Sequence, residues 1–206
     1  METNYFKEDD FLKDNQNIHT AKETINQNDI RRILVPSHRL TPLKNSWDTI
    51  VSLLVEKMKL MLRMNVQRRT IEIKNSNETN DNLNLQRADD FLQAYILGFE
   101  LNDAVSFLRV DDIYLETFDI KDIKNLHGDH LSRAIGRITG EKGKTRHAIE
   151  NSTKTRIVVA DSKISVMGGF TNLKLARNAI SSLIMGSPSN KVYNQLRMIA
   201  KRKSEI

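Results

Sequence analysis

Two glycines with basic neighbours are the residues whose types and spacing best fit a chemical task. Gly140 and Gly143 form a GxxG pattern, and Lys142, Lys144 and Arg146 lie within it or directly after it. Because glycine has no Cβ, the backbone can adopt open angles there and lie against a sugar-phosphate chain. Free N–H groups at the start of a following helix, together with the helix dipole, favour a phosphate. The spacing therefore predicts a loop that can hold the phosphates of a nucleic acid.

The sequence on either side of the glycines predicts the elements that hold this loop. Apolar residues recur at i, i+3, i+4 and i+7 between Leu131 and Ile138, which is typical of one helical face. Alternating residues joined by the turn dipeptide Asp161-Ser162 indicate a pair of strands. The predicted order is a strand or pair of strands over 113–120, a helix over 131–138, the glycine loop, a short helix through Ile149, strands over 155–160 and 163–167, and a closing helix from about Asn172 that Gly186 and Pro188 end.

This order of elements is that of a KH domain, which binds single-stranded nucleic acid in a groove. The GxxG loop forms one wall of such a groove, and the edge of the sheet, here predicted at Arg156–Val159, forms the other. Thr153 and Ile157 stand at the offsets that are usual for KH domains. The second half of the chain is therefore predicted to be a KH domain.

A nucleotide-binding P-loop is the competing interpretation of the same glycines. Gly143, Lys144 and Thr145 match the end of its GxxxxGK[ST] pattern. That pattern also needs a glycine at position 138, where the chain has Ile138. A P-loop follows a strand, whereas this loop follows a predicted amphipathic helix, so the P-loop interpretation is rejected.

The first half of the chain repeats the plan of the second half without the loop. Its predicted elements are a short strand from Arg31 that Pro36 ends, a turn-rich connection to Pro42, a helix with an apolar face from Trp47 to Met58, a hairpin around 62–73, a polar loop over 75–84, a helix over 88–99 and a shorter one around 104–108. The glycine loop and the helix after it have no counterpart. We therefore predict an α+β chain of two tandem type I KH-like modules, the first degenerate and without a GxxG, the second with the loop and followed by a basic C-terminal helix over 190–203.

The charge of the chain is distributed unevenly between the predicted parts. Residues 1–30 are predicted to be a disordered acidic tail, with three Lys against seven acidic residues. The predicted modules are 31–112, with 12 basic and 11 acidic residues, and 113–206, with 17 and 8. A basic half beside a neutral one indicates that the basic half meets a polyanion, because Lys and Arg near phosphates release condensed counterions.

Composition excludes several classes of protein and of site. No apolar stretch reaches the roughly 18 residues that span a bilayer, and the N-terminus lacks the basic start and apolar run of a secretory signal, so we expect no membrane contact and an intracellular protein. The absence of Cys removes disulfides, thiolate zinc sites and Cys nucleophiles. His127 and His130 lack a third metal ligand nearby, and a helix cap by Asp129 is favoured there. No nucleophile stands with a base at motif spacing, so no cofactor, no metal and no enzyme activity are predicted.

Several stretches together are similar to one known family. Gly128–Ile138 leading into the GxxG, with Lys144-Thr145 after it, resembles the partner-of-Nob (Dim-type) family of pre-ribosome assembly factors. The similarity extends over Arg31-Arg32-Ile33, Pro36, His38-Arg39, Thr41-Pro42-Leu43, Phe91, Ala94–Phe99 and Lys191-Val192-Tyr193. Glu141 and Lys142 differ from the family pattern, in which a basic residue and an additional glycine stand between the two invariant glycines. The resemblance covers the chain from about Arg31 to its C-terminus.

This resemblance implies a function and a set of partners. The family acts on the precursor of the small-subunit rRNA near its 3′ end and has the Nob endonuclease as its protein partner. Other small-subunit assembly factors and ribosomal proteins are further expected partners, and the implied location is the nucleolus and nucleus, with passage to the cytoplasm on pre-ribosomes. The predicted RNA-binding residues are Arg133, Arg137, Gly140, Glu141, Lys142, Gly143, Lys144, Thr145, Arg146, Arg156, Lys201, Arg202 and Lys203.

Two other functions compete with an assembly factor that binds pre-rRNA without cutting it. A general KH regulator that binds single-stranded mRNA would share the same loop, and cosedimentation with small-subunit precursors would separate the two. A nuclease would have to cleave RNA as pure protein with a divalent metal. The degenerate first module and the stretch Gly128–Ile138 favour the assembly factor.

Overall fold

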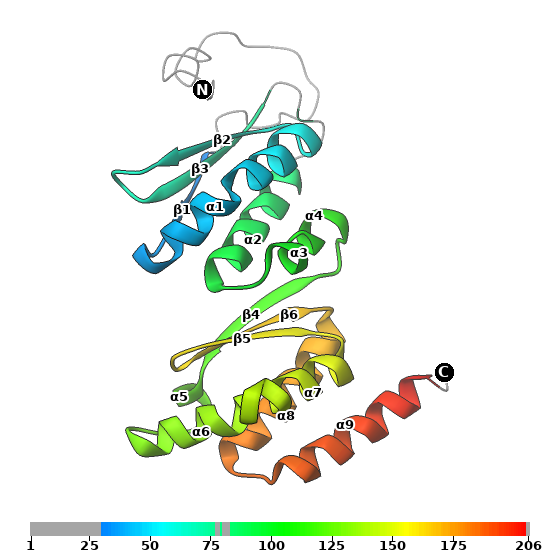
Figure 1. Ribbon diagram of the computed structural model, residues 1–206. Coiled ribbons are helices and arrows are strands. Elements are labelled where there is room, and N and C mark those ends of the chain that lie inside the picture. The colour runs from blue at the N-terminus through cyan, green and yellow to red at the C-terminus, as the bar shows by residue number, and fades with distance from the viewer. Residues whose placement is uncertain (1–29, 77–78, 80–82, 205–206) are drawn as a thin grey trace. The chain divides into compact units, whose positions relative to one another are not determined.

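A computed structural model of the chain describes residues 30–76, 79 and 83–204 (Figure 1). The predicted acidic tail over 1–30 lies outside the described residues except for Ile30, which begins the first strand. Half of the predicted polar loop over 75–84, residues 77–78 and 80–82, also lies outside them. No helix in the described part of the chain is both long enough and apolar enough to cross a bilayer.

The chain divides into two compact units, Met1–Asp89 and Asp90–Ile206. The division falls within helix α2, Leu83–Leu97. The module boundary between residues 112 and 113 is a different point of the chain, and it stays a prediction.

The first sheet is antiparallel, with the strand order β1-β3-β2. Its strands are β1 (Ile30–Leu34), β2 (Leu60–Asn65) and β3 (Thr70–Asn75), and the hairpin of β2 and β3 confirms the predicted one. Between β1 and β2 lie a short 3-10 turn (Ser37–Arg39), α1 (Leu40–Val51) and a π-helical segment (Ser52–Lys57). The helix begins earlier than the predicted connection to Pro42 allows, because proline is tolerated in the first turn, where its missing N–H has no partner to lose.

Two short helices follow α2 where one was predicted. They are α3 (Leu101–Ala104) and α4 (Ser106–Arg109). The core of the first unit is built from apolar side chains of the sheet and of the helices: Ile33, Val35, Leu43, Ile50, Leu53, Leu54, Met58, Leu60, Leu62, Ile71, Ile73, Leu85 and Ala88.

The second sheet has the same antiparallel order, β4-β6-β5. Its elements run in the order β4 (Tyr114–Asp119), α5 (Ile120–Ile123), α6 (Asp129–Thr139), a 3-10 turn (Glu141–Gly143), α7 (Lys144–Thr153), β5 (Arg156–Ala160), β6 (Lys163–Gly168), α8 (Phe170–Met185) and α9 (Ser189–Ser204). In Figure 1, α6, α7 and α8 lie on one side of this sheet. The core between them contains residues such as Phe118, Ile138, Ile149, Ile164 and Ile180. This arrangement confirms the predicted KH architecture, with the GxxG between two helices.

Two local predictions about helix starts were wrong. Ile120 does not extend the strand but begins α5, because Asp119 caps that helix by accepting a hydrogen bond from the Lys121 backbone N–H at 3.0 Å. Asp129 is not a cap either. Gly128, at φ 53°, is the N-cap of α6, and Asp129 lies in the first turn of this helix. The helix dipole favours a negative charge there.

Candidate nucleic-acid interface

The GxxG loop is built on backbone angles that favour glycine. Gly140 has φ 71° and ψ 176°, and Gly143 has φ 80° and ψ 6°. A Cβ on Gly140 would lie 2.8 Å from the backbone nitrogen of Thr145 and would also overlap the Thr145 side chain. A Cβ on Gly143 would meet only the edge of the His147 ring, at 3.4 Å. Gly140 therefore closes the loop, and Gly143 leaves its outer side open.

Thr145 fixes the loop from the inside. It is buried, and its Oγ1 accepts a hydrogen bond from the Tyr193 hydroxyl at 2.9 Å. Tyr193 belongs to α9, so the C-terminal helix is tied to the first turn of α7. The structure thus gives the predicted site residue Thr145 a supporting place beneath the loop.

The outer side of the loop carries mixed charge. Glu141, Lys142 and Lys144 are all exposed. Neither lysine has a carboxylate partner among the described residues. Lys142 also adopts the left-handed conformation, at φ 54°. The loop therefore presents two unpaired cations, one anion and the N-terminus of a ten-residue helix.

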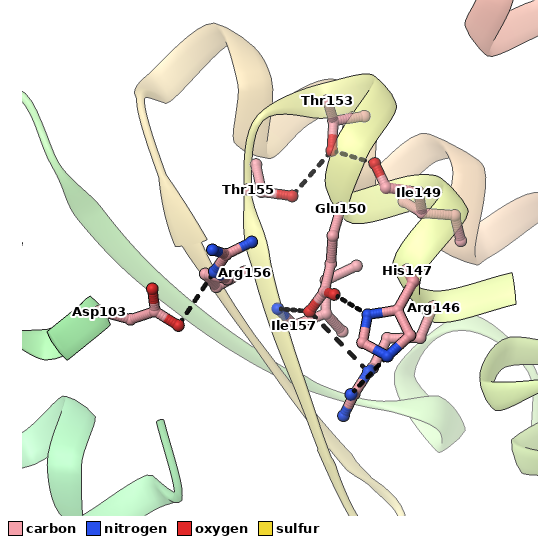
Figure 2. Close-up of polar contacts among 9 residues, drawn as sticks. All are labelled: Asp103, Arg146, His147, Ile149, Glu150, Thr153, Thr155, Arg156 and Ile157. Atoms are coloured by element: carbon pink, nitrogen blue, oxygen red, sulfur yellow. Dashed lines mark hydrogen bonds and ion pairs between the residues drawn. The ribbon is translucent and has the colours of Figure 1, made fainter. Parts of the chain in front are cut away.

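A buried carboxylate joins α7 to the edge strand β5 (Figure 2). The Oε1 atom of Glu150 accepts a hydrogen bond from the Ile157 backbone N–H at 2.9 Å, and its Oε2 lies 2.9 Å from His147 Nδ1. Only 6% of Glu150 is exposed. Because an ionised carboxylate only accepts hydrogen bonds, the proton between Glu150 and His147 belongs to His147. Glu150 therefore sets how the helix after the loop is held against the strand opposite it.

Arg146 is drawn into the same cluster. Its Nε lies 3.9 Å from Glu150 Oε1, and its Nη2 lies 3.3 Å from His147 Nε2. The Nε atom is buried and has no hydrogen-bond partner within the described part of the chain. Arg146 is thus a half-buried cation whose charge is partly matched by Glu150, and its donors are not all used.

Two threonines hold the turn between α7 and β5 (Figure 2). Thr153 Oγ1 donates to the Ile149 carbonyl at 2.7 Å and lies 2.8 Å from Thr155 Oγ1. Both threonines are buried. The left-handed Lys154 between them ends the helix and starts the strand. Thr153, which stands at an offset usual for KH domains, thus has a structural role in this turn.

Arg156, at the start of β5, is paired with Asp103 of α3, a residue of the same compact unit. Its Nε donates to Asp103 Oδ2 at 2.9 Å, and this hydrogen bond raises the pKa of Arg156 above its ordinary value. The two residues lie beside a hollow of about 380 Å³ between α7 and β5. Three carboxylates and two arginines line this hollow: Glu100, Asp103, Glu150, Arg146 and Arg156. The hollow beside β5 is therefore not a strongly basic surface.

The other predicted arginines and lysines outside the loop do not line this hollow. Arg133 and Arg137 are exposed on α6 and line a different hollow from the one beside β5. Lys201 and Arg202 are exposed on α9, and the side chain of Lys203 lies outside the described residues. The structure thus brings Arg146 and Arg156 to one hollow, and Arg133 and Arg137 to another.

Sequence reasoning missed Glu150, His147 and Asp103. Glu150 stands four residues after Arg146, a spacing that predicts a pair on one helical face. Nothing in that spacing shows that the carboxylate is buried. Asp103 is 53 residues from Arg156, so no local pattern could have found it. His127 and His130 do not join any group of three or more possible metal ligands in the part of the chain that the structure describes.

Comparison with known proteins agrees with this geometry. One family model, the Krr1 KH1 domain, matches residues 31–110, and a second, the eukaryotic type KH-domain (KH-domain type I), matches residues 117–201. Dim2p from Pyrococcus horikoshii OT3 has a similar structure, with a TM-score of 0.73, 26% identity and coverage of 82% of this chain and 99% of that one. A chain of the a/eIF2alpha-aDim2p-rRNA complex from the same organism has a TM-score of 0.74, 26% identity and coverage of 84% and 95%.

Curated relatives are more similar still. The pre-rRNA-processing protein PNO1 of Debaryomyces hansenii is 55% identical over 175 residues, which are 85% of this chain and 69% of that protein. The protein of the same name from Saccharomyces cerevisiae is 54% identical over 176 residues, 85% of this chain and 64% of that protein. These matches confirm both the predicted pair of KH domains and the predicted family. The chain belongs to the PNO1 family of pre-rRNA-processing proteins.

Proposed function

We propose that this protein binds single-stranded pre-rRNA of the small ribosomal subunit near its 3′ end and holds it for cleavage by another protein. The observation that carries this proposal is the GxxG loop, with glycine-only angles at Gly140, an open outer side at Gly143 and a helix N-terminus behind it. KH domains clamp about four nucleotides with such a loop. The names of the relatives and the similar chain from an rRNA complex support pre-rRNA as the RNA.

The loop is suited to a backbone clamp more than to a deep pocket. Lys142 and Lys144 can contact phosphates from either side of Gly143, because neither is engaged by a carboxylate of the described chain. Backbone N–H groups at the start of α7 add donors that do not depend on the base. Bases would then lie toward β5, where Arg156 is already held in place by Asp103. Contacts to phosphate position the RNA, and contacts to base edges select its sequence.

The partners proposed for this clamp are proteins of the same particle. The Nob endonuclease is the proposed cutting partner, and other small-subunit assembly factors and ribosomal proteins are proposed neighbours. The protein itself acts by position: it shields the site early and later presents it to the docked nuclease, without a cofactor. The proposed location is the nucleolus and nucleus, with passage to the cytoplasm on pre-ribosomes.

Substitution of Gly143 tests the clamp directly. Gly143→Asp adds a negative charge where phosphate approaches, and we expect RNA affinity to fall about tenfold or more at low salt. Gly143→Asn is the matched control, because it has the same shape without the charge and tolerates the left-handed conformation. We expect Asn to lose far less affinity than Asp at equal melting temperature. Unchanged affinity in Gly143→Asp would show that the loop is not the clamp.

Depletion of the protein tests its place in the cell. We expect precursor with an unprocessed 3′ end of the small-subunit rRNA to accumulate, as measured by RNA blotting. Normal processing after complete depletion would refute the assignment. Metal-dependent cleavage of RNA by the purified protein alone would overturn the proposal that another protein makes the cut.

A further inference from the structure

A second hollow lies at α6, and no residue of the hollow beside β5 lines it. Its volume is about 350 Å³. The residues that line it come from the segment after α5, from α6 and from the end of α8: Lys124, Leu126, His130, Arg133, Arg137 and Met185. All of them belong to the second compact unit.

The helical period explains why these side chains share one face. His130, Arg133 and Arg137 stand at i, i+3 and i+7, so they lie on one side of α6. Ala134 and Ile138, which border this face, are fully buried in the core of the domain. The packing of α6 therefore forces the basic face outward and fixes its position.

The charge of this hollow differs from that of the hollow beside β5. No carboxylate lines it. Among the described residues, Lys124, Arg133 and Arg137 have no ion pair. Unpaired cations gathered in a concave surface attract a polyanion more strongly than cations already matched by acids. Phosphates are therefore favoured at this hollow over the one beside β5.

Arg137 is held toward the hollow by its surroundings. A Cβ on Gly186 would lie 3.5 Å from Arg137 Nη1, so the guanidinium lies close against the end of α8. The C-terminal end of a helix carries partial negative charge, which favours a cation there. No hydrogen bond from Arg137 to another described residue is present, so its donors are available to a ligand. Arg133 donates a hydrogen bond from its Nε to the Asp129 carbonyl oxygen at 3.3 Å.

We propose that this hollow binds the backbone phosphates of the RNA segment that continues beyond the nucleotides clamped by the GxxG loop. The path is short, because α6 ends at the loop and the rise from His130 to Arg137 is about 10 Å. Leu126 and the exposed Met185 give the hollow an apolar floor on which a ribose or base can rest. This inference rests on the proposed function, since it assumes that the loop binds RNA.

Two RNA lengths separate this site from the loop. The probes are a tetranucleotide, which fits the roughly four positions of a KH loop, and a single-stranded RNA of about 12 nucleotides. The variants are Arg133→Gln and Arg137→Gln in the full chain, because Gln removes the charge and keeps a good helix former. Lys174→Gln is the matched control. Lys174 is an exposed cation of α8, about 16 Å along that helix from Met185.

We expect each arginine variant to bind the longer RNA about threefold to tenfold more weakly and to bind the tetranucleotide as the parent chain does. The slope of log affinity against log salt for the longer RNA should fall by about 0.7 for each lost phosphate contact. Lys174→Gln should change neither affinity. Gly143→Asp should weaken the binding of both RNAs. If it weakens neither, the proposed function of the loop is refuted, and the affinities of the arginine variants can still be interpreted separately. If both arginine variants bind the longer RNA with the affinity of the parent chain, the proposal is overturned. An acidic protein segment would then be the ligand to test at this hollow.

Discussion

The two sheets of this protein have the same strand order, yet the helices between their strands differ. In the first unit, α1 runs into the π-helical segment Ser52–Lys57 and then turns into β2. In the second, α6 ends at Gly140, and the loop and α7 follow before β5. The KH sheet therefore does not need the glycine loop in order to form. The loop is an addition to the fold, and it is present only where we propose that RNA binds.

The arginines of the first sheet and those of α6 also differ in their partners. In the first sheet, buried Glu72 stands opposite both Arg32 and Arg63 in the strand register and pairs with them at 3.4 and 2.6 Å. Arg31 pairs with Asp89 at 2.9 Å. On α6, by contrast, Arg133 and Arg137 have no carboxylate partner among the described residues. The first sheet uses these arginines for its own folding, whereas α6 leaves Arg133 and Arg137 for a ligand.

The largest expected effect is on the closing glycine of the loop. Gly140→Ala should destabilise the second unit by about 3 kcal/mol, because its angles are open almost only to glycine and its Cβ would overlap Thr145. Gly136→Ala, within α6, is the control: nothing lies within 4 Å of its Cβ, so it should stabilise the unit by about 0.5–1 kcal/mol. Thermal and urea melts measure both. Equal stability of the two variants would mean that the loop can rearrange at no cost.

Glu72 tests whether the first region's cations serve folding. Glu72→Gln leaves two arginines without their carboxylate, and we expect a loss of about 2 kcal/mol, less than for a fully buried pair because 36% of the Arg63 side chain is exposed. RNA affinity should stay within about twofold of the parent. Arg32→Gln is the control, since 64% of that side chain is exposed and its pair is worth little. A tenfold loss of RNA affinity in Glu72→Gln would break the division of labour between the regions.

The sequence predicted those features that depend on local spacing. The hairpin around 62–73, the helix before the glycines and the turn at Asp161-Ser162 follow from periodicity and turn residues, and all are present. The π-helical segment was not predicted, because its apolar pattern is also that of an ordinary helix. Nor could spacing show that Arg137 lines a hollow at the end of α8, since that depends on how α6 and α8 pack. Long-range partners such as Asp103 need the folded chain.

Glu141 tests the mixed charge of the loop. Glu141→Lys replaces the one exposed anion among the loop lysines, and we expect RNA affinity to rise about fivefold at low salt and the gain to shrink as salt increases. Glu56→Lys makes the same change at an exposed position of the π-helical segment, where the first region lacks a loop. That control should gain much less. An equal gain in both variants would point to net charge alone, and a loss in Glu141→Lys would show that Glu141 faces away from the RNA.

The smallest expected effect is on the pH dependence of stability, and it arises at the ends of β1 and β4, the first strands of the two sheets. After β1, Pro36 begins the next turn with no side-chain cap, whereas Asp119 after β4 caps α5. The hydrogen bond from the Lys121 backbone N–H, with a second from the Ser162 hydroxyl at 2.8 Å, lowers the pKa of Asp119 below its ordinary value of 3.8.

Because the fold favours the charged carboxylate, the stability that Asp119 contributes is present above its ordinary pKa and is lost as the pH falls through the lowered one. The parent chain should therefore lose more stability between about pH 5 and pH 3 than Asp119→Asn does, with melting temperature as the measurement. Ser162→Ala removes one of the two donors, and its slope should lie between those of the parent and Asp119→Asn. Identical slopes in all three proteins would show that the acid response arises elsewhere, and a steeper slope in Asp119→Asn would reverse the sign of the argument.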